Sequence, residues 1–303
     1  MNKRKTAIAA IFVAFVTAVI VSVCFFANNH HNGKMVVTTN FVAYDFARAV
    51  IGDANEVKML LKPGAETHDF EPTPQDIKEI ADADFFIYTG GESDEWVEKI
   101  LSDNNISTSK TIKMFDYVDL IKEDGDEDEY DEHIWTNPLN AIRIVNGIRD
   151  RLVAKNPAKY DEYAGNAQKY TETIKDIDAQ FRNIINSAQR KELVFADRFP
   201  FRYFVEEYGL SYVAAFPGCS DQTETSSSTI ALLVDKVKTD QLPAVLKIEL
   251  TSDKLAKTIS DETGAKILTL NAAHNISQED FDNGITYTDI MSRNLGVIRE
   301  ALN

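Results

Sequence analysis

Three of the five histidines in this 303-residue chain stand where they could bind a metal ion: His68, His133 and His274. Each follows a region whose sequence predicts a strand, and each falls in a loop or at the boundary of an element. Imidazoles presented in this way are typical ligands of zinc and other divalent transition metals. A single loop histidine is usually structural, so the hypothesis depends on three of them drawn from both halves of the chain.

The elements that must position these histidines form two blocks of alternating strands and helices. The predicted strands are residues 35–39, 56–61, 85–88, 111–115, 193–196, 212–216, 244–249 and 266–270. This alternation predicts an α/β fold with two lobes, each built on a mainly parallel sheet flanked by helices. Ligands of such open sheets bind in loops beyond the carboxyl ends of strands, where the three histidines are expected.

One long backbone helix is predicted to join the two lobes. Asn156 and Pro157 give a helix start, with a capping side chain followed by proline at the first helical position. Apolar residues then recur at three- and four-residue steps to Ala188. The predicted division is therefore a signal or membrane tether at 1–34, an N-terminal lobe at 35–155, the connecting helix at 156–188 and a C-terminal lobe at 189–303.

Two runs around the first two histidines resemble a known family. PGAETHDFEPTP at residues 63–74 and HIWTNP at residues 133–138 are similar to two signatures of the zinc/manganese solute-binding proteins of ABC importers. The resemblance extends over Met35 to Asn303. It implies that His68 and His133 are the first two metal ligands. It also implies a monomeric, extracytoplasmic, non-enzymatic protein that delivers its metal to a membrane permease driven by a cytoplasmic ATPase.

The third and fourth ligands of the resembled family have no direct match. The third is a histidine or glutamate after a strand of the second lobe, where this chain reads ADRFPFRYF at residues 196–204. Asp197 is the candidate there, and a salt bridge to Arg198 or Arg202 is the alternative. The fourth is a carboxylate after the last strand, where this chain has His274. Glu249 competes with His274, or accepts a hydrogen bond that orients a ligating imidazole.

The metal set implied by the resemblance is therefore His68, His133, Asp197 and His274. Three imidazoles and one carboxylate suit tetrahedral Zn²⁺, whereas Mn²⁺ draws more oxygen ligands and remains possible. The acidic run at residues 123–132, just before His133, is either a solvated loop or a weak collector of cations. The formal net charge of −16 favours cations and disfavours nucleic acid as a partner.

The first residues read as an export signal. A basic cluster at residues 3–5 precedes an uncharged stretch from Thr6 to Ala27 that is long enough to span a bilayer. Cys24 near its end predicts either a bacterial lipoprotein or a retained signal anchor, and both tie the folded part to the outer face of the cell membrane. His30 and His31 then read as linker. Cys219 lacks a partner, which excludes a structural disulfide and a thiolate metal cluster.

Two other functions remain open from the sequence. A metal-containing surface adhesin is compatible with the tether and the same fold. A zinc hydrolase needs an open coordination position and a general base. The chain has no His-Glu-x-x-His helix, and a closed four-ligand site leaves no position for a substrate, so a hydrolase is the weaker alternative.

Overall fold

The computed structural model describes residues 34–65, 70–123, 129–216, 218 and 225–303. Their strands form two separate four-stranded sheets, ordered β2-β1-β3-β4 and β6-β5-β7-β8, and every strand pair is parallel. The first sheet comprises β1 (Val36–Thr38), β2 (Val57–Met59), β3 (Phe85–Tyr88) and β4 (Thr111–Lys113). The second comprises β5 (Glu192–Phe195), β6 (Ser211–Ala214), β7 (Ala244–Lys247) and β8 (Lys266–Thr269).

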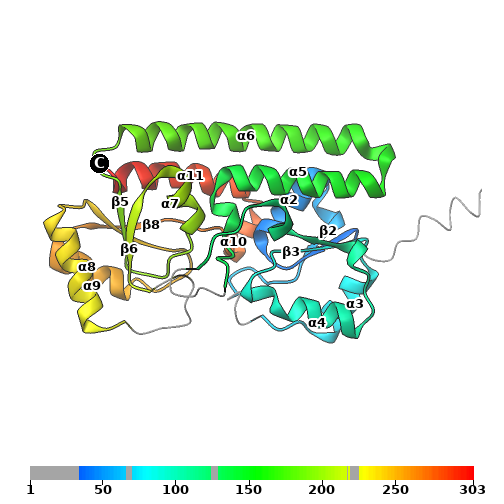
Figure 1. Ribbon diagram of the computed structural model, residues 1–303, viewed down its shortest axis with the longest axis horizontal. Helices are drawn as coiled ribbons and strands as arrows, with labels where there is room; N and C mark the ends of the chain where they lie inside the picture. Colours follow the sequence, from blue (N-terminus) through cyan, green and yellow to red (C-terminus); the bar gives the residue numbers. More distant parts are fainter. Residues whose placement is uncertain (1–33, 66–69, 124–128, 217, 219–224) are drawn as a thin grey trace, which may run out of the picture.

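Helices cover both sheets (Figure 1). Those of the N-terminal lobe are α2 (Phe41–Ile51), α3 (Pro74–Asp82), α4 (Glu95–Asp103) and α5 (Pro138–Lys155). Those of the C-terminal lobe are α7 (Arg202–Tyr208), α8 (Ser227–Thr239), α9 (Lys254–Thr263), α10 (Gln278–Asp282) and α11 (Tyr287–Ala301). Short 3-10 turns lie at Ala54–Glu56, Glu92–Asp94, Thr108–Lys110, Met114–Tyr117, Ile134–Thr136 and Pro157–Lys159.

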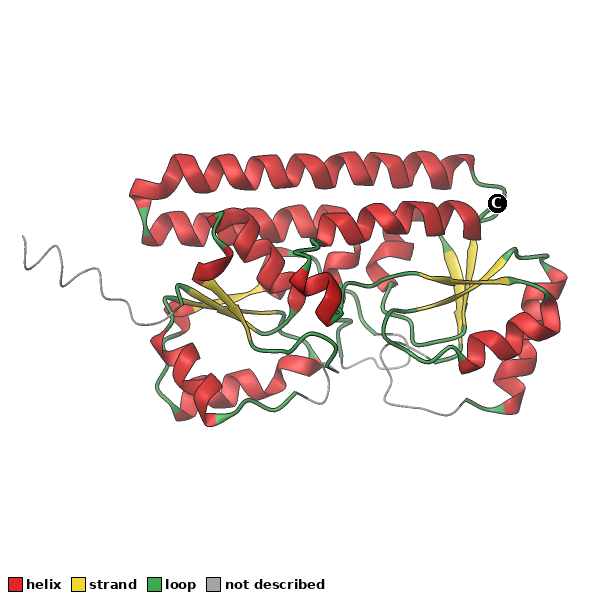
Figure 2. Cartoon of the chain, turned by 180° about the vertical axis from the view of Figure 1, so that it is seen from behind, coloured by secondary structure: helices red, strands yellow, loops and turns green. Residues whose placement is uncertain are grey.

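Helix α6 (Tyr160–Ser187) runs along both lobes and packs on α2, α5 and α11 (Figures 1 and 2). It begins directly after the 3-10 turn at Pro157–Lys159, which Pro157 opens as predicted, but the predicted cap Asn156 makes no side-chain capping hydrogen bond. Its inner face buries residues at the predicted spacing, among them Tyr163, Ala167, Ile174 and Phe181. The predicted α/β fold of two parallel-sheet lobes joined by a long helix is confirmed.

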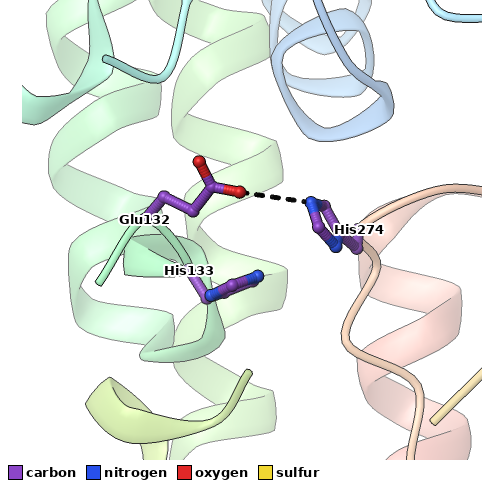
Figure 3. A group of neighbouring side chains, drawn as sticks. All are labelled: Glu132, His133 and His274. Atoms are coloured by element: carbon purple, nitrogen blue, oxygen red, sulfur yellow. Dashed lines mark ion pairs between the residues drawn. The ribbon is translucent and has the colours of Figure 1, made fainter. Parts of the chain in front are cut away.

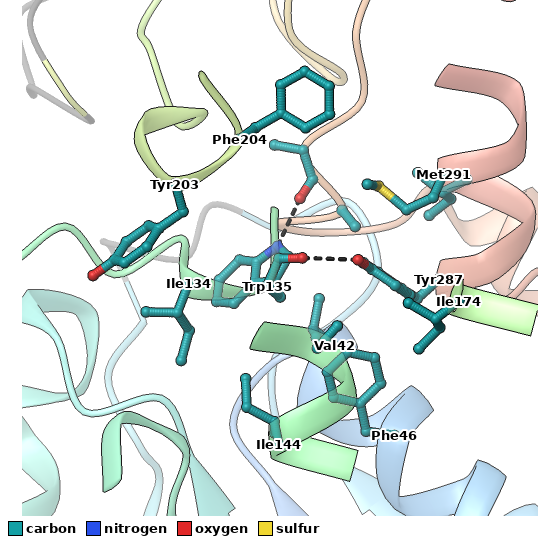
Figure 4. Packing of buried hydrophobic residues seen from close by; sticks show 14 of the residues in the cluster. Val42, Phe46, Ile134, Trp135, Ile144, Ile174, Tyr203, Phe204, Tyr287 and Met291 are labelled. Carbon is teal, nitrogen blue, oxygen red and sulfur yellow. Dashed lines mark hydrogen bonds between the residues drawn. The ribbon is translucent and has the colours of Figure 1, made fainter. Parts of the chain in front are cut away.

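The two lobes touch through a buried aromatic residue. Trp135 is 1% exposed, and its indole N–H donates to the carbonyl oxygen of Ala272 at 2.7 Å (Figure 4). The hydroxyl of Tyr287, at the start of α11, donates to the Trp135 carbonyl at 2.8 Å. A buried indole has to satisfy its donor, and here a carbonyl of the other lobe accepts that hydrogen bond. The segment that carries His133 is thereby held against the segment that carries His274.

Within the ranges that the structure describes, no helix is both long and apolar enough to cross a bilayer. Residues 1–33 of the predicted signal or membrane tether, with Cys24, His30 and His31, lie outside those ranges, and so does Cys219.

Candidate metal site

Three side chains from the two lobes converge where the lobes meet. Glu132 and His133 come from the N-terminal lobe and His274 from the C-terminal lobe (Figure 3). One ligand atom from each lies within 4.8 Å of the other two, and all three residues are buried. The two imidazoles meet edge to face with their ring centroids 4.8 Å apart. The structure therefore brings His133 and His274 together across the two lobes.

His133 is fixed by the start of a helix. Its carbonyl oxygen accepts hydrogen bonds from the backbone N–H of Thr136 at 3.0 Å and from the Thr136 hydroxyl at 2.8 Å. Asn137 then caps α5 by accepting from the Leu139 N–H at 2.8 Å, and Pro138 occupies the first helical position. The signature around His133 is thus also a helix start, and it gives the imidazole a rigid support.

Asp131 orients the His133 ring. Its Oδ1 lies 3.1 Å from the ring Nδ1 and also accepts from the His133 backbone N–H at 2.8 Å. An acceptor at Nδ1 places the ring proton there, so that Nε2 is the ring nitrogen that carries a lone pair. Carboxylates behind ligating histidines commonly set the tautomer and raise the basicity of the ligand in this way. Asp131 itself is buried and is held through its carbonyl oxygen by the Tyr203 hydroxyl at 2.9 Å.

His274 lies in the loop after β8, which is held in place by hydrogen bonds to Glu249. Glu249 accepts from the backbone N–H of Ala272 at 2.7 Å and from that of His274 at 3.0 Å. Ala273 between them has a φ of +56°, a left-handed conformation that is unfavourable for a residue with a side chain. Such a conformation persists only where neighbours impose it. Burial raises the pKa of Glu249, and the backbone donors partly offset that effect.

Glu132 is held by Ser93, in the turn that follows β3. The Ser93 hydroxyl donates to Oε1 at 2.6 Å and its backbone N–H donates to Oε2 at 3.1 Å. The same Oε1 lies 3.5 Å from Nε2 of His274. The next residue, Asp94, accepts from the N–H groups of Thr89 and Gly90. Burial, reinforced by the charge of Glu132, raises the pKa of Asp94 to about 7.

His68 lies outside the described residues, but the chain just before it is held against the site. Asn275, the residue after His274, donates its side-chain amide to the carbonyl oxygens of Lys62, at 3.2 Å, and Ala65. The Gly64 N–H donates to the carbonyl oxygen of Ile276 at 2.8 Å. The loop that leads to His68 thus begins beside His274. His68 as a ligand remains a prediction.

Asp197 lies at the carboxyl end of β5, as predicted, but it does not belong to the group of three. Its Oδ2 accepts from the Thr251 hydroxyl at 2.5 Å and the Ile248 N–H at 3.2 Å, and its Oδ1 accepts from the Arg198 N–H at 2.9 Å. These bonds join two loops of the C-terminal lobe. Glu249 also lies outside the group, and it supports His274 through the backbone instead of through the imidazole.

The sequence prediction missed Glu132, Asp131 and Ser93 as parts of the site. Glu132 appeared only as one of many carboxylates in the acidic run. The described residues near the two ends of the run pair with each other. Lys122 and Tyr130 form an isolated antiparallel β-bridge, and the Asp131 N–H donates to the Ile121 carbonyl oxygen at 3.0 Å. This pairing returns the chain so that Glu132 points inward. A second, more exposed acidic group consists of Glu92, Glu123 and Glu129.

Comparison with known proteins gives a consistent result. The family model of the zinc-uptake complex component A, periplasmic (ZnuA), matches residues 36–301. The zinc-binding lipoprotein AdcA of Streptococcus pneumoniae is 33% identical over 282 residues, which cover 89% of this chain and 56% of that protein. The high-affinity zinc uptake system protein ZnuA of Bacillus subtilis is 31% identical over 281 residues, covering 88% and 87%.

Among solved structures, the Zn(II)-bound ZnuA-like domain of Streptococcus pneumoniae AdcA superimposes with a TM-score of 0.77 at 32% identity. The match covers 89% of this chain and 99% of that domain. The chain spans about half the length of the AdcA proteins that it matches. On the extent of the family match and the shared two-lobe fold, this chain belongs to the ZnuA family of periplasmic zinc-uptake components.

Proposed function

We propose that this protein captures a divalent transition metal, Zn²⁺ in the first place, between its two lobes and delivers it to the permease of an ABC importer. The observation that carries the proposal is the meeting of Glu132, His133 and His274, with ligand atoms within 4.8 Å of one another. Two imidazoles and a carboxylate at that spacing match the donors of tetrahedral zinc. Contributions from both lobes allow one ion to join them.

The burial of the group supports a cation as its ligand. Glu132 is 6% exposed and His133 is 1% exposed. A buried carboxylate is costly by several kcal/mol unless a positive charge compensates it. A divalent ion between Glu132 and the two imidazoles would provide that compensation, with His133 binding through Nε2, because its Nδ1 faces Asp131.

His68 is proposed as a third imidazole of the site. Its loop starts beside His274, through the hydrogen bonds of Asn275 to Lys62 and Ala65. A set with three imidazoles favours Zn²⁺ over Mn²⁺, because Mn²⁺ has the lowest affinity for such ligands among the first-row divalent metal ions. The names of the zinc-binding relatives support the same metal, and Mn²⁺ is a possible second cargo.

The remaining parts of the proposal concern the setting of the protein. We place it as a monomer on the outer face of the cell membrane, tied there by residues 1–34, with a permease and a cytoplasmic ATPase as partners. The relatives described as a lipoprotein and as an uptake-system protein support this arrangement. The acidic run before His133 would act at most as a weak collector that raises the local concentration of cations.

The test is a calorimetric titration of the full-length protein with Zn²⁺ and, in parallel, with Mn²⁺. The wild type is expected to bind one Zn²⁺ with submicromolar affinity and Mn²⁺ more weakly. The double variant His68→Ala/His133→Ala is expected to lose that affinity, while His30→Ala/His31→Ala, which removes two histidines from the predicted tether, keeps it. Undiminished binding by the first double variant would remove the proposed site.

A further inference from the structure

Glu132 is held in place from two sides. Ser93 donates to both of its carboxylate oxygens, from the hydroxyl and from the backbone N–H. On the other side a Cβ at Gly91 would come within 2.5 Å of the Glu132 Cβ and 2.8 Å of its Oε2. Contacts that short do not occur, so the side chain rests directly on the glycine backbone. A carboxylate held this firmly is preorganised for a ligand.

The carboxylate of Glu132 lies beside the other two side chains of the group. Oε1 faces the ring of His274 at 3.5 Å from Nε2, a separation that a metal ion could bridge after a small adjustment. Glu132 also neighbours His133 in the chain, so the N-terminal lobe presents an oxygen and a nitrogen ligand side by side.

The carboxylate of Asp197 lies in the C-terminal lobe and accepts hydrogen bonds there. Three donors of its own lobe, the Thr251 hydroxyl and the N–H groups of Ile248 and Arg198, occupy its two oxygens. These bonds tie the end of β5 to the loop after β7, which is a structural task. The carboxylate of Asp197 is not among the ligand atoms that lie within 4.8 Å of one another at His133 and His274, whereas that of Glu132 is.

We propose that Glu132 is the carboxylate ligand of the metal, in the role that the sequence predicts for Asp197, and that Ser93 is the residue that positions it. The inference rests on the proposed function and specifies its ligand set. The N-terminal lobe then supplies two ligands that are adjacent in the chain, Glu132 and His133, and the other lobe supplies His274. Asp197 serves to hold the C-terminal loops in place.

The experiment compares zinc affinities by calorimetry with competing chelator, in the full-length protein. Glu132→Gln keeps the shape of the side chain and removes its charge, and it is expected to weaken Zn²⁺ binding by about 100-fold or more, beyond the 10–100-fold typical of supporting residues. Glu95→Gln makes the same charge change on the exposed side of α4 and is expected to leave the affinity unchanged. Circular dichroism and thermal unfolding of the metal-free proteins check that each variant is folded.

The role of Ser93 is tested by a pair of variants. Ser93→Ala removes the hydroxyl donor and is expected to weaken Zn²⁺ binding by about 10-fold. Ser93→Thr retains a hydroxyl and is expected to restore most of the affinity. The absorption spectrum of bound Co²⁺ gives a readout that a change in stability does not move. It should shift in Glu132→Gln, which changes a ligand, and keep its shape in Ser93→Thr.

Asp197→Asn distinguishes the two carboxylates. The inference requires Glu132→Gln to lose much more affinity than Asp197→Asn, and to change the Co²⁺ spectrum where Asp197→Asn does not. The reverse order would assign the carboxylate to Asp197 and overturn the inference. Failure of the wild type to bind Zn²⁺, or full affinity in His133→Ala, would instead refute the proposed function itself, so the two failures are separable.

Discussion

The imidazoles of His133 and His274 lie edge to face with their centroids 4.8 Å apart, although one belongs to each lobe. Trp135 connects the same two segments, because it contacts both rings and donates its indole N–H to Ala272. The two proposed ligands therefore already lie close together. On the proposed function, an ion would bind with local adjustment of side chains and without a large closure, consistent with the long helix α6 that packs along both lobes.

The contact between Asp131 and His133 predicts a graded loss of metal affinity. Asp131→Ala removes the acceptor behind the ring and behind the His133 N–H, and it should weaken Zn²⁺ binding on the order of 10–100-fold. Asp131→Asn keeps an oxygen acceptor without the charge and should lose less. Titration calorimetry gives both values, with Asp119→Asn, an exposed carboxylate, as control. Equal affinity in Asp131→Ala and the wild type would show that the ring needs no such support.

Asn275 should stabilise the contact between the lobes. Asn275→Ala leaves two carbonyl oxygens, of Lys62 and Ala65, without this donor, at a cost of about 1–3 kcal/mol of unfolding free energy. Urea unfolding of the metal-free protein measures that cost. Asn283→Ala, at an exposed position after α10, should change stability by less than about 0.5 kcal/mol. If the unfolding free energies of the two variants differ by less than about 0.5 kcal/mol, the hydrogen bonds of Asn275 do not contribute to stability.

Asp94 predicts a pH-dependent stability. Because its pKa is raised to about 7 in the folded protein, the folded state binds a proton that the unfolded chain has lost above its ordinary value of 3.8. Stability from this group is therefore lost as the pH rises from about 4 to about 7, and the loss is complete above that. A shift of this size corresponds to about 4 kcal/mol, as an order of magnitude.

Asp94→Asn removes this dependence, since an amide cannot ionise and can still accept from Thr89 and Gly90. Relative to the wild type, the variant should become more stable with rising pH up to about 7 and then stay level. Urea unfolding at a series of pH values, with a chelator present, measures the difference. A stability difference that does not change with pH would contradict the raised pKa of Asp94.

Much of the fold follows from local patterns. The apolar run at Phe85–Tyr88 gives strand β3 at its predicted bounds, and Asn156 with Pro157 precedes the long helix as expected. Helix α5 is not among the elements predicted from the sequence, and its start coincides with the signature around His133. The same residues begin helix α5 and support His133, because Asn137 caps the helix a few residues after that histidine.

The site was predictable only where a residue type is rare. Five histidines leave few choices, and two of the three singled out meet in the structure. Carboxylates are abundant, and which of them points inward depends on distant contacts such as Ser93 with Glu132. The bonds that occupy Asp197 likewise come from Ile248 and Thr251, far along the chain. No local pattern contains that information.

The most direct measurement is a crystal structure of the zinc-loaded protein with anomalous diffraction recorded at the zinc edge. We expect a single strong peak bound to Nε2 of both His133 and His274 at about 2.0–2.1 Å, the usual zinc–imidazole distance. A zinc ion bound to ligands of one lobe alone, or at any place that excludes His133 and His274, would contradict the proposal that one ion is held between the lobes.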